Sequence, residues 1–332
     1  MSTTHRSLVT GGAGFIGSHL VESLLRRGDA VTVVDDLSTG FEANLEQARQ
    51  VGGGRLRFVK ATLSEAEQRT DLDAFDRVYH LAAAVGVRRV MQRPVDSLEV
   101  NVLETSAAIR LAQRTGARTF IASSSEVYGK STRLPFNESD DVVYGPTSVT
   151  RWSYGCSKAL DEFMALAAHR SAALPVVVMR LFNTVGPRQV GRWGMVLPRF
   201  IEAARANRPL EVHGDGLQSR CFADVRDVVR GIEQIVECDG ALGGVFNIGS
   251  DRKIGMHALA ELVIRRTASR STIVHQSYEA AFGTGFEDLR AREPDLTRIR
   301  SVIGFDASIP LEQTIDDIGA WLDATSRKEH AA

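Results

Sequence analysis

The stretch that decides the fold is Ser7-Leu8-Val9-Thr10, followed at once by Gly11-Gly12-Ala13-Gly14-Phe15-Ile16-Gly17. The first four residues predict a short buried strand, and an amphipathic run continues from the glycines to about Arg27. Glycines between a strand and a helix permit a tight turn and a close approach to a pyrophosphate, which the helix N-terminus also favours. The segment predicts a dinucleotide-binding turn whose contact residues are Gly11, Gly14, Phe15, Ile16 and Gly17.

An acidic residue follows the next predicted strand. Ala30 to Val34 is the strand, and Asp35 stands just after it, about 20 residues beyond the turn, where a carboxylate can accept hydrogen bonds from adenosine ribose hydroxyls. An acid at this position without an obvious basic partner favours NAD over NADP. Arg26 and Arg27 on the preceding helix are the residues that would favour NADP.

A tyrosine and a lysine are four residues apart in Tyr154-Gly155-Cys156-Ser157-Lys158, within a predicted helix from Arg151 to Arg170. Four residues make about one helical turn, so the phenol and the ammonium share a face. A nearby ammonium favours the phenolate and is expected to bring the pKa of Tyr154 down toward the working pH. The pair therefore predicts a general base.

The composition excludes several classes of function. The chain has 332 residues and a formal net charge of −1, without a clustered basic stripe, so nucleic acid is not expected as a partner. Three cysteines without a C-x-x-C spacing argue against a disulfide framework and a zinc site, and no histidine cluster suggests a metal. Apolar runs are too short to span a bilayer, so we expect a cytoplasmic protein without membrane contact.

Apolar strand-like runs alternate with helical patterns along the first half of the chain. After the first two strands, the predicted strands are Leu56 to Lys60, Arg77 to Leu81, Arg118 to Ala122 and Val176 to Leu181. Such alternation predicts an α/β protein with a Rossmann-type, doubly wound parallel sheet, whose ligands bind beyond the carboxyl ends of the strands.

The pattern becomes irregular after residue 185. We expect residues 1–185 to form the NAD-binding domain and residues 186–325 to form a smaller, partly interleaved α/β substrate domain. Its predicted elements are a strand at Leu210 to His213, a helix at Val225 to Glu237 and a strand at Val245 to Ile248. Residues 326–332 are polar and are expected to be a frayed tail.

Taken together, these segments resemble the extended short-chain dehydrogenases/reductases, in the group of NAD-dependent nucleotide-sugar epimerases, dehydratases and decarboxylases. The resemblance spans nearly the whole chain. Besides the glycine turn and the Tyr154/Lys158 pair, it rests on Val78-Tyr79-His80-Leu81-Ala82-Ala83, Asn101, Ser123-Ser124-Ser125-Glu126-Val127-Tyr128-Gly129, Arg180-Leu181-Phe182-Asn183-Thr184-Val185-Gly186-Pro187, and Gly214-Asp215-Gly216 leading to Arg220. One departure is Thr62, which stands where the family usually carries an aspartate that contacts adenine.

The resemblance assigns roles to residues at these motifs. Tyr154 would take the proton from a sugar 4-hydroxyl as hydride leaves C4, Lys158 would hold the tyrosinate and the nicotinamide ribose, and Ser125 would hydrogen-bond the same sugar oxygen. Further cofactor contacts are implied at Leu81, Ala82, Ala83, Asn101 and Ser123. Asn183 and Arg220 are implied to contact the sugar nucleotide, and Arg292 is a second phosphate candidate.

Two features suggest a substrate with a C6 carboxylate. The loop after Pro187 carries Arg188 and Arg192, and the stretch from Gly145 to Ser153 resembles enzymes acting on UDP-glucuronic acid. A uronate oxidised at C4 is a β-keto acid, which loses carbon dioxide unless its carboxylate is pinned. Our candidates for the pin are Arg192 with Thr184 and Ser124, which favours UDP-glucuronate 4-epimerase, producing UDP-galacturonate.

Glu126 favours a different outcome. In related decarboxylases and dehydratases, a glutamate after this serine or threonine is part of the active site, so UDP-glucuronate decarboxylase is the main alternative. UDP-glucose 4-epimerase, a dehydratase and a non-catalytic NAD-sensing protein are the others. By resemblance alone, the helices from Pro94 to Thr115 and from Arg151 to Arg170 are expected to form the interface of a homodimer.

Overall fold

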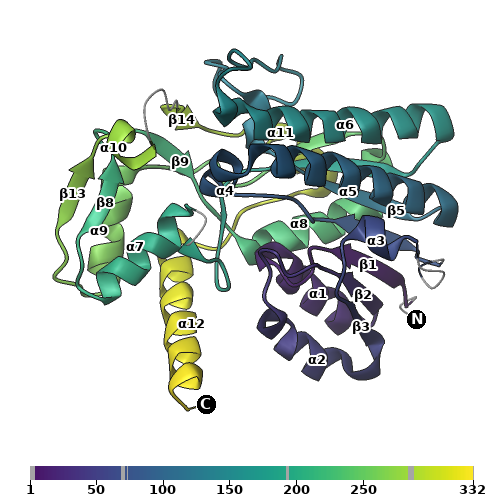
Figure 1. Ribbon diagram of the computed structural model, residues 1–332, viewed down its shortest axis with the longest axis horizontal. Helices are drawn as coiled ribbons and strands as arrows, with labels where there is room; N and C mark the ends of the chain where they lie inside the picture. Colours follow the sequence, from purple (N-terminus) through teal and green to yellow (C-terminus); the bar gives the residue numbers. More distant parts are fainter. Residues whose placement is uncertain (1–3, 69–71, 73, 192–193, 283–287, 332) are drawn as a thin grey trace.

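The computed structural model describes residues 4–68, 72, 74–191, 194–282 and 288–331. Its largest element is a seven-stranded parallel sheet in the order β11-β6-β5-β4-β1-β2-β3 (Figure 1). These strands are β1 (Arg6–Thr10), β2 (Ala30–Val34), β3 (Leu56–Val59), β4 (Arg77–His80), β5 (Arg118–Ser124), β6 (Val176–Leu181) and β11 (Val245–Ile248). The predicted Rossmann-type architecture is confirmed, and the strand order reverses between β1 and β4.

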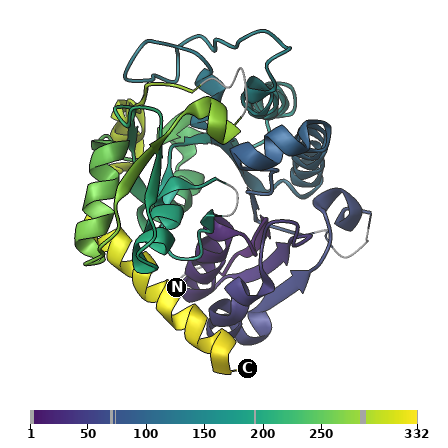
Figure 2. The same cartoon turned by 60° about the vertical axis from the view of Figure 1, so that its left-hand side comes forward.

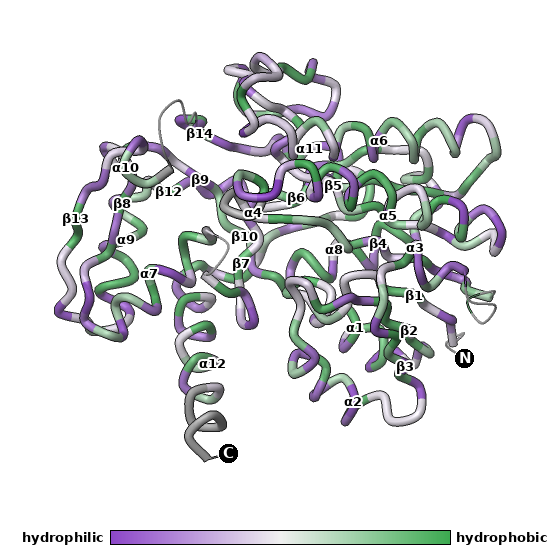
Figure 3. Tube along the Cα trace, in the orientation of Figure 1, coloured by the Kyte–Doolittle hydropathy of each residue, from purple (hydrophilic) through white to green (hydrophobic). Residues whose placement is uncertain are grey.

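Helices cover both faces of this sheet. On one face lie α1 (Phe15–Arg27), α2 (Glu46–Gly52), α8 (Val225–Glu237) and α11 (Thr297–Ile303). On the other lie α3 (Leu63–Ala66), α5 (Pro94–Thr115) and α6 (Ser153–Ala172), with α4 (Val87–Gln92) before α5. The middle residues of most strands are apolar and buried, as expected for a parallel sheet covered on both faces, whereas polar residues occur mainly at the strand ends (Figure 3).

A smaller lobe packs beside the carboxyl ends of the strands (Figures 1 and 2). Its helices are α7 (Val196–Arg205), α9 (Met256–Arg266), α10 (Tyr278–Phe282) and α12 (Leu311–Ala331). Its strands form small sheets from β7 (Thr184–Val185) with β10 (Ala223–Asp224), β8 (Leu210–His213) with β13 (Ile273–Gln276), and β9 (Ser219–Cys221) with β12 (Lys253–Gly255) and β14 (Ala291–Arg292). A separate apolar core, which includes Leu197, Phe200 and Ile318, holds this lobe together.

The chain crosses between the two parts more often than the predicted boundary at residue 186 implies. Val245–Ile248, expected in the smaller domain, is β11 and forms the edge of the main sheet against β6. Helix α8 likewise packs against α1 rather than inside the smaller lobe. Helix α12 continues to Ala331 and so includes residues 326–331, which the sequence predicts as a frayed tail.

Candidate active site

The glycine turn begins the site at the carboxyl end of β1. Gly11 has a φ of +68°, and a Cβ there would lie 2.9 Å from the backbone nitrogen of Ala82. A Cβ on Gly17 would lie 2.2 Å from the Gly11 carbonyl oxygen. Helix α1 starts at Phe15 without an acidic residue in its first turn. The turn therefore leaves its backbone and the helix N-terminus open to an anion.

Asp35 is held by the backbone of this turn. Its carboxylate accepts hydrogen bonds from Ala13 N (2.9 Å) and Leu37 N (2.8 Å), and burial raises its pKa. The carboxyl group faces the same cavity of about 530 Å³ as the glycine turn. Most of the expected cofactor contacts line this cavity: Gly11, Gly14, Phe15, Ile16, Gly17, Asp35, Leu81, Ala82, Ala83, Ser123, Tyr154 and Lys158.

Asn101 is the exception among the expected cofactor contacts. It does not line the cavity and is almost fully buried in α5. Its side chain accepts a hydrogen bond from Ala84 N (2.8 Å) and donates one to Ser157 Oγ (2.9 Å). Asn101 therefore ties the loop after β4 to α6.

Thr62 lies at the far end of the cavity, where the family pattern would place an aspartate. Its hydroxyl accepts a hydrogen bond from Glu65 N and caps α3. Glu104 of α5 brings a carboxylate to the same region and accepts a hydrogen bond from Leu63 N (2.6 Å). A negative charge is thus present beside Thr62, although it comes from a different element.

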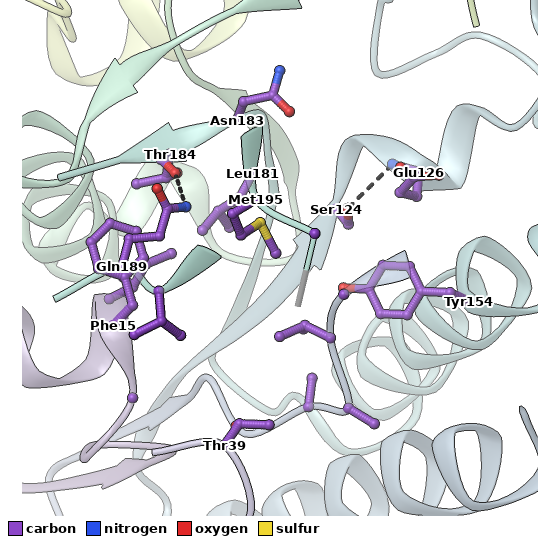
Figure 4. A pocket seen from close by; sticks show the side chains of 18 of the residues that line it. Phe15, Thr39, Ser124, Glu126, Tyr154, Leu181, Asn183, Thr184, Gln189 and Met195 are labelled. Carbon is purple, nitrogen blue, oxygen red and sulfur yellow. Dashed lines mark hydrogen bonds between the residues drawn. The ribbon is translucent and has the colours of Figure 1, made fainter. Parts of the chain in front are cut away.

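The Tyr154 side chain points into the cavity beside Ser124 (Figure 4). Burial raises the pKa of Tyr154 above that of a free phenol, and the charge of Glu126 adds to the rise. The expected lowering by Lys158 is not seen, because Lys158 Nζ donates to Asp161 Oδ2 at 2.7 Å, one turn further along α6. Both side chains line the same cavity, while the Lys158 ammonium is hydrogen-bonded to Asp161.

Three serines at the end of β5 lead into Glu126. Ser123 donates to Glu162, Ser124 Oγ accepts from Glu126 N (3.2 Å), and Ser125 is buried against the cavity. The Glu126 carboxylate accepts hydrogen bonds from Arg151 Nη1 (2.6 Å) and Arg151 Nη2 (3.0 Å), and it also forms an ion pair with Arg292. Burial acts to raise the pKa of Glu126, but the charges of Arg292 and Arg151 outweigh it and lower the pKa to about 2. Glu126 is therefore ionised beside Tyr154.

The expected phosphate ligands Arg220 and Arg292 lie together on β9 and β14. Asp288 joins them, since it accepts from Arg220 Nη2 (2.8 Å) and Arg292 Nη2 (3.0 Å). Burial, followed by the charge of Arg292, lowers the pKa of Arg220 to about 10. Arg292 thus contacts carboxylates on both sides and links Glu126 to the Arg220 end of the cavity.

The remaining expected substrate contacts divide into two groups. Asn183 and Thr184 line the cavity, where Asn183 donates to Cys221 O (3.2 Å) and Thr184 O accepts from Gln189 (Figure 4). Arg188 also reaches the cavity wall, but its guanidinium is held against α1 by Glu22 and by Ser18 Oγ (3.2 Å). The substrate contact expected of Arg188 stays a prediction, and Arg192 lies outside the described residues.

A family model described as the NAD dependent epimerase/dehydratase family matches residues 7–249. The chain belongs to this family. The match covers the glycine turn, Tyr154, Lys158 and β11, and it makes the protein an enzyme of the NAD-dependent epimerase/dehydratase family with NAD as its cofactor.

Three proteins illustrate what this family member is similar to. It is 37% identical to the UDP-N-acetyl-alpha-D-glucosaminuronate decarboxylase of Bacillus cytotoxicus, over 95% of this chain and 97% of that protein. It is 33% identical to the UDP-glucuronic acid decarboxylase 1 of Arabidopsis thaliana, over 93% of this chain and 67% of that protein. Among solved structures, an epimerase from Methanothermobacter thermautotrophicus superposes with a TM-score of 0.88 at 25% identity, covering 100% of this chain and 96% of that one.

The residues present fit the family cofactor. A side chain at Gly11 or Gly17 would clash with the backbone, which leaves the peptide groups of the turn free to approach a pyrophosphate, and Asp35 offers a fixed carboxylate to a ribose. No His, Cys, Asp or Glu cluster suited to a metal occurs in the part of the chain that the structure describes. Across that same part, no helix is long and apolar enough to cross a membrane.

Two site residues of this family member were not predicted. Arg151 and Asp288 had no role assigned, yet they hold Glu126 and the two β-strand arginines. The sequence offers weak signals for both: Arg151 stands three residues before Tyr154, and Asp288 begins the alternating charge pattern Asp288-Leu289-Arg290-Ala291-Arg292. Only the fold shows that Arg151 pairs with Glu126 and that Asp288 pairs with both strand arginines.

Proposed function

We propose that this enzyme oxidises a UDP-hexuronate at C4 and then removes its C6 carboxylate as carbon dioxide. The observation that carries the proposal is the ionised Glu126, fixed by Arg151 and Arg292 next to Tyr154. Similarity to two decarboxylases of UDP-hexuronates, over 95% and 93% of this chain, supports it. The 4-epimerase that the sequence favoured is the second candidate, since the cavity and the Tyr154/Lys158 pair serve both reactions.

The chemistry starts at the sugar 4-hydroxyl. Tyr154, as phenolate, takes the hydroxyl proton, while Ser124 and Ser125 hydrogen-bond the same oxygen as it becomes a carbonyl. NAD, when bound, supplies the acceptor for the C4 hydride and returns it at the end. Because burial and Glu126 raise the pKa of Tyr154, the phenolate depends on nearby positive charge, for which Lys158 is the available ammonium.

The 4-keto uronate is a β-keto acid. Cleavage of its C5–C6 bond releases carbon dioxide and leaves the electron pair in an enolate that the C4 oxygen carries, and C5 then takes up a proton from water. Tyr154, which holds the proton from the first step, and the serine hydroxyls stabilise this enolate oxygen. Return of hydride to C4 gives a UDP-pentose.

The charges near Glu126 favour loss of the substrate carboxylate over its retention. An epimerase must hold the substrate carboxylate through positive groups, but Arg151 and Arg292 already pair with Glu126, and Arg188 pairs with Glu22. The fixed negative charge of Glu126 makes a second carboxylate nearby unfavourable. Departure of that carboxylate as neutral carbon dioxide relieves the repulsion.

The decisive experiment incubates the purified protein with NAD and either UDP-glucuronic acid or UDP-N-acetylglucosaminuronic acid. NMR then identifies the sugar product, and released carbon dioxide is measured in parallel. A UDP-pentose with carbon dioxide supports the proposal, whereas a C4-inverted UDP-hexuronate without carbon dioxide identifies the epimerase. Tyr154→Phe is the control, and turnover by this variant would remove Tyr154 as the base in either reaction.

We also propose that the protein forms a homodimer through α5 and α6, which pack side by side (Figure 1). Large apolar side chains are exposed on both helices, with Leu103 58% exposed on α5 and Phe163 65% exposed on α6. Such residues are unfavourable in water unless a partner covers them. Phe163→Glu should shift the species seen by analytical ultracentrifugation from dimer to monomer, and a monomeric wild type would refute the interface.

A further inference from the structure

A buried ion pair lies directly behind the Tyr154/Lys158 pair. Lys158 Nζ donates to Asp161 Oδ2 at 2.7 Å, and the two side chains are 2% and 0% exposed. A carboxylate this deep is costly unless it is paired, and so is an ammonium. Asp161 is thus in contact with one of the two groups that the reaction uses, although it does not line the cavity itself.

The groups facing Asp161 come from three elements. Glu162 of α6 directs its carboxylate to Arg180 and Ser123, so it does not share Lys158. Thr105 of α5 lies between Asp161 and His80 of β4, whose Nε2 is 3.2 Å from Thr105 Oγ1. Burial, and then the charge of Lys158, lower the pKa of His80 to about 3, so His80 is neutral. Lys158 is therefore the cation that balances Asp161.

We propose that Asp161 is a positioning residue, which fixes one N–H group of Lys158 and so sets the direction of its ammonium. The inference rests on the proposed use of Tyr154 as the base. An ammonium has three N–H groups, so two remain for a cofactor ribose and for the Tyr154 side.

The same negative charge acts on Tyr154. After burial and the charge of Glu126, Asp161 contributes to the raised pKa of Tyr154. Removing the charge of Asp161 thus favours the phenolate of Tyr154 and disfavours the protonated form of Lys158. Both changes move the active protonation state of the pair toward lower pH.

The test is Asp161→Asn, which keeps the shape of the side chain and removes its charge. In the pH profile of kcat/KM, both the acid limb and the alkaline limb should move to lower pH, by about half a unit to one unit. Calorimetric titration with NAD alone, which needs no sugar, should show affinity falling at alkaline pH in the variant but not in the wild type. Unmoved limbs and an unchanged NAD titration would overturn the proposal.

Two controls separate positioning from folding. Asp227→Asn removes another fully buried carboxylate, on α8, which pairs with Arg230 and accepts from Ile309 N (2.9 Å); it should lower the melting temperature without moving either limb. In a Lys158→Met background, adding Asp161→Asn should raise the melting temperature, because it removes an uncompensated buried charge. A further loss of stability there would contradict the pairing. Because the NAD titration and these melting curves need no sugar, they can fail independently of the proposed decarboxylation.

Discussion

The two ends of the cavity are built by different means. The cofactor end is formed mainly by the backbone: the glycines leave the peptide groups of the turn uncovered, and two peptide N–H groups hydrogen-bond the Asp35 carboxylate. At the other end, charged side chains form a chain of ion pairs that runs from Arg151 through Glu126, Arg292 and Asp288 to Arg220. The first end depends on local chain geometry, and the second depends on residues as far as 166 positions apart.

The largest effect should come from adding a side chain to the backbone-built end. Gly17→Ala would place a Cβ 2.2 Å from the Gly11 carbonyl oxygen, so the turn must distort where the pyrophosphate approaches. We expect NAD affinity to fall by about 100-fold or more in calorimetric titration. Gly54→Ala is the matched control, because nothing lies within 4 Å of its Cβ, and it should bind NAD normally. Normal NAD binding by Gly17→Ala would show that the turn is not so tightly constrained.

The charge-built end should respond differently, in turnover more than in NAD affinity. Arg292→Met removes one of the two cations that hold Glu126 and also frees Asp288 from one partner. We expect kcat to fall by about 10²-fold while NAD affinity stays within twofold. Arg290→Ala, two residues earlier and 75% exposed in its side chain, should retain wild-type turnover. Equal losses in the two variants would mean that the strand, rather than the Glu126 contact, matters.

Strong acid should weaken the charge-built end. The pKa of Glu126 is lowered to about 2 from an ordinary value of 4.5, so its stabilisation is fully present above pH 4.5 and is lost as the pH falls toward 2. This difference in the pKa of Glu126 corresponds to a contribution of about 3 kcal/mol to the free energy of unfolding, as an upper limit. Urea unfolding at several pH values should show this loss in the wild type and a smaller one in Glu126→Gln. Parallel pH curves would refute the depressed pKa.

The smallest effect is expected at Arg188, which lies near the cofactor end although the sequence suggested a substrate contact. Arg188→Met removes the contact with Glu22 on α1, at a cost of about 1 kcal/mol in stability. The KM for a UDP-hexuronate should stay within twofold. A tenfold increase in KM would instead return Arg188 to the substrate carboxylate.

The contrast between the two ends also explains what could be predicted from the sequence. The glycine turn, Asp35 and the strand bounds of β2 and β6 follow from local patterns, so they match the structure closely. The partners of Glu126 could not be predicted in this way, because they lie far from it in the sequence. Arg151 belongs to the segment before Tyr154, and Arg292 belongs to a short strand that pairs with β9. Lys158 was assigned to the correct face of α6, but its contact with Asp161 depends on burial that a helical spacing does not reveal.

Strand β11 lies far along the sequence from β6, its neighbour in the sheet, and this limits where the chain can be truncated. Strand β6 is formed by residues 176–181, yet its outer hydrogen-bonding edge is covered only when residues 245–248 pair with it. A fragment ending near residue 185 would expose that apolar edge to other chains and invite aggregation. The NAD-binding part therefore cannot be produced in soluble form by cutting the gene at the apparent boundary, and a minimal fragment must extend beyond Ile248.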